Sequence, residues 1–214
     1  MPFALMISYD GFEKEEDLKV LQDHLNFLAQ QNISLSTIEN VPGYLKKESG
    51  KTLTLSFNHA HPDFMRKAHQ LLYSRQVPYT LIVDLADWRK SEDITFLQKL
   101  KNDENVTIGL HTLHYEVHGQ ISDFRHELVR SKTLFEDIFG VKPKIFSFTK
   151  GLYTTAMRDF VQDMGFDIIL GQQSGAISDI NVNYVWPQFK VTPYKNFTVQ
   201  GLDIILQTRP LPIS

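Results

Sequence analysis

The spacing of apolar and polar residues changes repeatedly along this chain. Short apolar runs alternate with longer segments in which apolar residues recur at helical spacing. Over residues 13–31, for example, Leu18, Leu21, Leu25 and Leu28 fall on one face of a helix. The pattern therefore predicts strands and helices in alternation.

The predicted elements follow one another without a linker or an internal repeat. Helices are expected over residues 13–31, 62–75, 91–101, 122–139 and 153–164, with Pro62 in a first turn and Gly140 and Gly165 at helix ends. Strands are expected over residues 3–9, 52–58, 79–84, 106–111, 144–148, 166–170, 184–191 and 203–207.

This alternation predicts a parallel sheet covered by helices. We expect one domain over residues 1–214, built as a distorted (β/α) barrel of about seven parallel strands. A regular eightfold barrel typically needs ~250 residues, so a shortened form is expected. In a barrel the site lies at the C-terminal ends of the strands.

Composition narrows the range of functions. The net charge of -3 gives no indication of a nucleic-acid or anionic-membrane partner, and the absence of cysteine excludes disulfides and thiolate chemistry. No apolar run approaches the ~20 residues of a membrane span, and the N-terminus lacks the features of a signal peptide. We expect a cytoplasmic protein with no membrane span.

Polar side chains follow several predicted strands. Those at the expected site are Asn58, His59, His61, His111, His114, Lys150 and Thr208. Three imidazoles with a water form a competent zinc site, so His59, His111 and His114 are candidate ligands, with His61 as an alternative to His114. The alternative is that these histidines only cap loops or face solvent.

Other chemistry-bearing residues have structural interpretations. Asp10 and Asp84 follow strands but neither pairs with another acid at a useful spacing, and the segment from Asp84 to Trp88 is interpreted as a helix-capping loop. Trp186 and Tyr153 are candidates to stack on a sugar ring or to pack in the core.

The order of these segments resembles the polysaccharide deacetylase (NodB-homology) family of carbohydrate esterases. Thr54-Leu-Ser-Phe-Asn-His-Ala-His61 stands where the family carries Thr-Phe-Asp-Asp-Gly. Ile108-Gly-Leu-His-Thr-Leu-His-Tyr115 is similar to Ile-Gly-x-His-Thr-x-x-His. Phe146-Ser-Phe-Thr-Lys-Gly151 and Ile204-Ile-Leu-Gln-Thr208 stand for the third motif and the final strand. The resemblance implies a distorted (β/α) barrel and a metal-dependent deacetylase ancestry.

This sequence departs from the family at the residues that carry its chemistry. The resemblance places Asn58 at the general-base position, His59 at the metal aspartate and Thr208 at the general-acid histidine. His111 keeps the first metal histidine, whereas the second falls on Tyr115 with His114 one place early. Losing a general acid or base typically costs ~10²–10⁴-fold in rate each, so the family mechanism is not expected unchanged.

Three hypotheses follow for the function. The first is a hydrolase of acetamide groups on N-acetylated glycans, with a divalent metal, zinc foremost, at a rebuilt site. The second is a catalytically inactive descendant that binds a glycan or a glycan-synthesis partner, and the third is a structural or partner-binding domain with a filled cleft. Candidate substrate-binding residues are His61, Tyr115, Thr149, Lys150 and Trp186.

Overall fold

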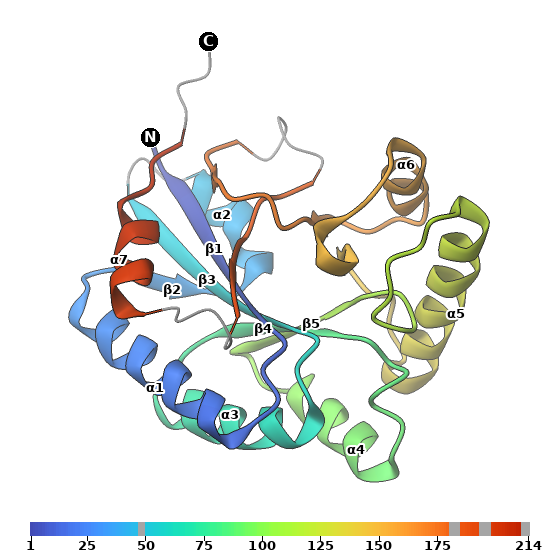
Figure 1. Cartoon of the computed structure of the whole chain (residues 1–214), viewed down its shortest axis with the longest axis horizontal. Helices are drawn as coiled ribbons and strands as arrows, with labels where there is room; N and C mark the ends of the chain where they lie inside the picture. Colours follow the sequence, from blue (N-terminus) through green and yellow to red (C-terminus); the bar gives the residue numbers. More distant parts are fainter. Residues whose placement is uncertain (47–49, 180–184, 193–197, 211–214) are drawn as a thin grey trace.

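A computed structural model describes residues 1–46, 50–179, 185–192 and 198–210 of the chain. Its centre is a twisted sheet, coloured blue to orange in Figure 1. Six strands run parallel in the order β7-β6-β5-β4-β3-β1. They are β1 (Phe3–Asp10), β3 (Lys51–Asn58), β4 (Tyr79–Val83), β5 (Val106–Leu110), β6 (Ile145–Ser147) and β7 (Ile168–Leu170).

Short strands complete the sheet and bring its two edges together. β2 (Ser34–Ser36) pairs with β3, and β8 (Ala176–Ile177) runs antiparallel to β1. β9 (Phe189–Val191) runs parallel to the end of β1, while Trp186 just before it bridges to Leu170 of β7. This segment therefore contacts both edge strands, and the predicted distorted (β/α) barrel is confirmed.

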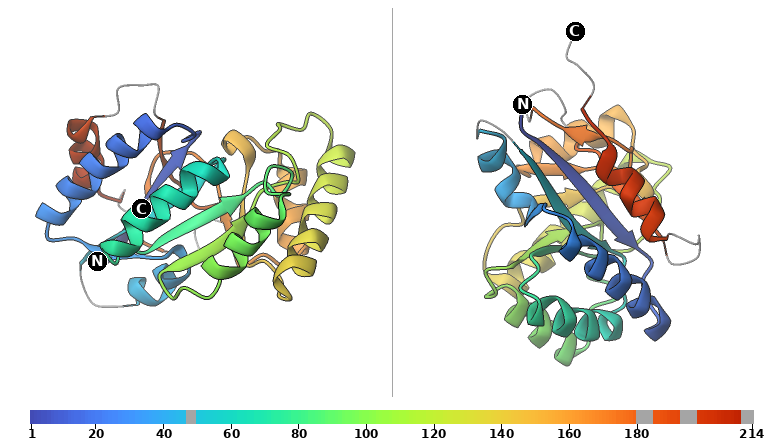
Figure 2. Two further views of the ribbon diagram at one scale, coloured as in Figure 1. Left: turned by 90° about the horizontal axis from the view of Figure 1, so that it is seen from below. Right: turned by 90° about the vertical axis from the view of Figure 1, so that its left-hand side faces the viewer.

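Helices cover the outside of the sheet, as the two views of Figure 2 show. They are α1 (Glu15–Gln30), α2 (Val41–Leu45), α3 (Pro62–Ser74), α4 (Ser91–Leu100), α5 (Ile121–Phe139), α6 (Thr155–Asp163) and α7 (Val199–Gln207), with short 3-10 turns η1 (Ile38–Asn40) and η2 (Thr149–Gly151). No helix in the described ranges is long and apolar enough to cross a membrane.

Side chains of β3 alternate between two surroundings. Leu53, Leu55 and Phe57 belong to the large apolar core formed with the outer helices. The intervening Thr52, Thr54, Ser56 and Asn58 are buried on the opposite face, which lines the barrel interior. Because the last of these, Asn58, ends the strand, the polar row leads up to the C-terminal edge of the sheet.

The strand predicted over residues 203–207 is wrong, because this segment lies in helix α7. Thr198 caps the helix by accepting a hydrogen bond from the backbone N–H of Gly201, and Leu202, Ile205 and Leu206 are buried on one face. A short apolar run has the same composition in a strand and in a buried helix, so the sequence did not separate the two.

The prediction of a strand over residues 184–191 is correct in its C-terminal part only. The strand itself is Phe189–Val191, and Trp186 forms a single bridge. Tyr184 lies outside the described residues. The elements β2, η1, α2 and β8 were not predicted, because they are too short to show a hydrophobic period.

Candidate active site

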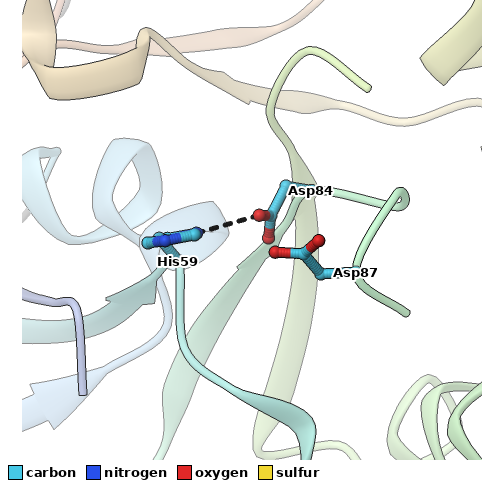
Figure 3. A group of neighbouring side chains, drawn as sticks. All are labelled: His59, Asp84 and Asp87. Carbon is cyan, nitrogen blue, oxygen red and sulfur yellow. Dashed lines mark hydrogen bonds and ion pairs between the residues drawn. The ribbon is translucent and has the colours of Figure 1, made fainter. Parts of the chain in front are cut away.

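Three ligand-type side chains meet beyond the C-terminal ends of β3 and β4 (Figure 3). His59 follows β3, Asp84 follows β4, and Asp87 lies in the turn after it. Their nearest ligand atoms lie within 4.8 Å of one another. Among the described residues this is the one group of three or more histidine, aspartate or glutamate side chains with that property.

His59 and Asp84 form a hydrogen-bonded pair. The distance from His59 Nδ1 to Asp84 Oδ2 is 2.9 Å; the Asp84 side chain is buried, while 31% of the His59 side chain is exposed. The hydrogen bond to Asp84 raises the pKa of His59 above its ordinary value. Burial raises the pKa of Asp84 to about 6. Across this contact the charged form of each group therefore favours the charged form of the other.

The backbone holds His59 in an unusual conformation. Its φ is 49°, in the left-handed region that non-glycine residues rarely adopt. Such conformations cost of order 1–3 kcal/mol and concentrate at functional sites. The turn after β3 thus directs this ring toward Asp84 despite local strain.

Tyr115 packs on both histidines that follow strands. Its ring is stacked on the His59 ring, with centroids 4.0 Å apart and planes 5° apart. It meets the His111 ring edge-on at 5.1 Å. A phenol ring therefore lies where the family resemblance expected a second metal-binding histidine.

The carboxylate of Asp10 is a centre of hydrogen bonds at the end of β1. Its Oδ2 accepts from the Tyr115 hydroxyl at 2.9 Å and from Gln172 Nε2 at 2.9 Å, and it pairs with Lys190 Nζ at 2.6 Å. Burial and the neighbouring Asp10 carboxylate raise the pKa of Tyr115, so its hydroxyl stays protonated and donates. Asp10 thereby connects β1 with residues after β5 and β7 and with Lys190 in β9.

His111 is fully buried and neutral. Its Nδ1 lies 2.6 Å from the carbonyl oxygen of Ser147, which can only accept, so Nδ1 carries the proton. Burial lowers the pKa of His111 to about 4. Its Nε2 is buried without a hydrogen-bond partner in the described part of the protein. This nitrogen is therefore an acceptor to which no described residue donates.

Asn58 is the last residue of β3. Its Nδ2 donates to Ser8 Oγ at 2.5 Å and more weakly to Ser56 Oγ at 3.4 Å. Its Oδ1 is buried without a partner among the described residues. An amide takes up no proton at neutral pH, so this residue is not a general base.

The remaining candidates lie in different surroundings. His114 is directed to Glu127 of α5, with Nδ1 2.8 Å from Oε2, and belongs to no group of three ligand atoms within the described ranges. His61 caps α3 by accepting from the Asp63 backbone N–H at 3.2 Å. The structure therefore does not gather His59, His111 and His114 into one compact set, and their joint metal binding stays a prediction.

Residues after β6 and β7 divide between surface and interior. Thr149 is buried, and its hydroxyl has no partner within the described ranges. Lys150 is exposed, with a left-handed φ of 53°. Trp186 is buried in the interior apolar cluster beside Leu170, so it packs in the core and offers no face to a ligand.

Thr208 lies at the opposite end of the barrel. It follows α7, whose last turn is bound by Lys51 through a hydrogen bond of 2.9 Å from Nζ to the carbonyl oxygen of Leu206. Lys51 begins β3, whereas Asn58 and His59 are at the other end of that strand. No acid is therefore expected from Thr208 at this site.

The positions of Asp84, Asp87 and Lys190 at this edge were not predicted from the sequence. Asp84 and Asp87 come at the end of the strand beside β3, and parallel strands place their C-terminal ends at one edge. The position of both aspartates after a strand was therefore the available signal. It was not used, because residues 84–88 were interpreted as a helix-capping loop. Lys190 lies in a strand that was predicted, but its pairing with Asp10 depends on the contact between β9 and β1, which a single sequence does not reveal.

The chain matches known proteins over most of its length. The family model described as "Polysaccharide deacetylase" matches residues 45–169, more than half of the chain. IcaB from Ammonifex degensii superposes with a TM-score of 0.77 at 14% identity, covering 96% of this chain and 99% of that one. A Streptococcus pyogenes deacetylase, PplD in complex with acetate, gives 0.75 at 14% identity, covering 97% of each chain.

A third solved structure shares the same architecture. The de-N-acetylase from Aggregatibacter actinomycetemcomitans superposes with a TM-score of 0.77 at 11% identity over 95% of this chain and 99% of that one. No curated protein matches the chain. At these identities the solved structures establish the fold.

Proposed function

Because this chain belongs to the polysaccharide deacetylase family, we propose that it removes acetyl groups from an N-acetylated glycan at a rebuilt metal site. The observation that carries this proposal is the convergence of His59, Asp84 and Asp87 at the C-terminal edge of the sheet. The rebuilt site lies beside the ancestral one, since it shares His59 and takes its carboxylates from the next strand.

The donor set suits a divalent cation, with zinc the foremost candidate. One imidazole and two carboxylates are common zinc ligands, and three protein ligands are typical of catalytic rather than structural sites. Asp87 is exposed and His59 partly so, which leaves one side of the group open to solvent. A cation held here would polarise an acetamide carbonyl and lower the pKa of a water molecule.

Neighbouring side chains position the substrate in this proposal. Tyr115 supplies an aromatic surface beside His59, and its hydroxyl is fixed by Asp10. Lys150 and Thr149, which follow β6, line the same edge, and His61 lies in the turn after His59. Lys190, held against Asp10, adds a cation to this edge.

Turnover is expected to be slow, because the family's base position holds Asn58 and its acid position falls at the far end of the barrel. These two observations favour a second candidate function, which is glycan binding without hydrolysis. A cytoplasmic location remains a prediction for either function.

The test combines metal analysis with product detection. The purified protein is loaded with zinc, desalted, analysed for metal and incubated with chitopentaose, and released acetate is measured. We expect one metal per chain and slow acetate release. Both should disappear in His59→Ala and Asp87→Asn, and both should persist in the exposed controls His126→Ala and Asp123→Asn.

Each other result has a defined meaning. Binding of chitopentaose by calorimetry without acetate release supports the glycan-binding candidate and overturns the hydrolase. A protein that retains its metal in both His59→Ala and Asp87→Asn does not use this group. Absence of both metal and sugar binding rejects both candidates.

A further inference from the structure

A cavity lies at the other end of the barrel from His59. It has a volume of about 960 Å³ and lies between the C-terminal turns of α3 and α4. Gln76, before β4, and Asn105, before β5, line its floor. Figure 1 shows these two helices beneath the sheet. A cavity of this size falls within the range of small-molecule sites.

One wall of this cavity is aromatic. His69 lies next to Tyr73 and Phe96, with ring centroids 5.7 Å and 5.8 Å away. Phe96 is itself stacked on the buried Trp88, which fixes that wall from behind. Tyr73 is 66% exposed, an unusually large share for an aromatic residue. Its ring therefore offers a face to a ligand.

His69 adds a fixed donor to this wall. Its Nδ1 lies 3.1 Å from the hydroxyl of the buried Tyr79. Burial raises the pKa of Tyr79, so the phenol stays protonated and donates to Nδ1. Burial also lowers the pKa of His69, which keeps the ring neutral with its proton on Nε2.

The rim of the cavity is polar and balanced in charge. Arg75 and Lys99 contribute two positive side chains, and Asp103 and Glu104 contribute two negative ones. Asp103 is held in place because its Oδ1 accepts from the Asn105 backbone N–H at 2.9 Å. An anion would meet the two acids and a cation would meet the two bases, so this rim favours an uncharged ligand.

A sugar ring has the chemistry that these walls match. A pyranose presents an apolar C–H face to an aromatic ring and a rim of hydroxyl groups that both donate and accept. The aromatic wall around Tyr73 suits the face, and the mixed rim suits the hydroxyls. We propose that this cavity binds an uncharged pyranose unit of an oligosaccharide, stacked on Tyr73. The site does not depend on hydrolysis at His59.

Amide chemical shifts in NMR titrations with chitotriose test this proposal. In the wild-type chain we expect shifts at Gln76, Asn102, Glu104 and Asn105. Tyr73→Ala should weaken the affinity at these amides about tenfold, while Tyr73→Phe retains it. The matched control Val141→Ala, at another exposed apolar residue, and His59→Ala should both leave it unchanged.

Three results would overturn the proposal. One is the absence of shifts at these four amides at millimolar chitotriose. Another is a set of shifts confined to residues around His59 and abolished by His59→Ala, which would assign the sugar to the first site. The third is equal binding of adenosine, which would show an aromatic stacking site without preference for a sugar.

Discussion

The ends of β3 and β5 each carry a histidine, but the two rings lie in opposite environments. His59 is partly exposed and paired with a carboxylate, which raises its pKa. His111 is fully buried and paired with a carbonyl, and burial lowers its pKa to about 4. Sequence spacing treats the two alike, whereas their surroundings place one beside a carboxylate at the edge of the sheet and keep the other neutral in the core.

The largest expected effect is a difference in the free energy of unfolding between variants that lack the His111 ring and variants that lack the His59 ring. His111→Ala leaves a cavity and removes the partner of the Ser147 carbonyl, so we expect a loss of about 3 kcal/mol in the free energy of unfolding. His59→Ala should cost about half of that, because the ring is partly exposed. Urea denaturation of both variants measures the difference; equal losses would contradict the contrast in burial.

His111 and His59 should contribute to the pH dependence of stability with opposite signs. The folded-state pKa of His111 lies below the ordinary value of about 6.5, so the unfolded chain takes up the proton first as the pH falls. Its contribution to stability is lost as the pH falls from 6.5 to 4, and the loss reaches about 2 kcal/mol at pH 5. His59, with a raised pKa, contributes stability that is present below pH 6.5 and lost as the pH rises through that pKa.

Denaturation of the wild-type chain and of His111→Gln at pH 7 and pH 5 isolates the contribution of His111. The variant should lose about 2 kcal/mol less than the wild type on acidification. Parallel losses in the two proteins would show that His111 titrates normally. NMR titration of the two imidazoles then reads their pKa values directly.

Removing the hydroxyl of Tyr115 tests the element that packs against both rings. Tyr115→Phe keeps the stack on His59 but deletes the hydrogen bond to the Asp10 carboxylate, so we expect a loss of about 1.5 kcal/mol. The exposed Tyr73→Phe serves as the control and should change stability little. An unchanged free energy of unfolding in Tyr115→Phe would mean that Lys190 and Gln172 alone meet the hydrogen-bonding needs of the Asp10 carboxylate.

The smallest effect concerns the backbone at His59. Because its φ is 49°, glycine should be favoured over alanine there by about 1 kcal/mol, although both remove the ring. Comparing His59→Gly with His59→Ala by thermal unfolding checks this. A more stable alanine variant would show that the turn after β3 is not strained.

Much of the fold could be predicted from the sequence, because apolar residues recur at a regular spacing in long amphipathic helices and form continuous runs in buried strands. The strands that surround the site were predicted in this way. The segment at residues 203–207 was not, since a buried helix and a strand share its composition. The family was identified from collinear motifs, whereas the location of the site at the C-terminal edge stays a prediction.

Which residues form the candidate site was harder to predict than where the site lies on the sheet. His114 follows the same strand as His111, yet the chain turns it toward Glu127 on α5. Asp84 and Asp87 come from a neighbouring strand, and only pairing of β3 with β4 places them beside His59. Such convergence depends on register and on turn geometry, which a single sequence does not specify.

The metal content of the purified, zinc-loaded protein shows whether His59, Asp84 and Asp87 hold a cation. We expect one zinc per chain in the wild type and in His111→Gln, and none in His59→Ala or Asp87→Asn. A chain that binds no zinc, or one that loses it in His111→Gln but keeps it in Asp87→Asn, would contradict the rebuilt site formed by His59, Asp84 and Asp87.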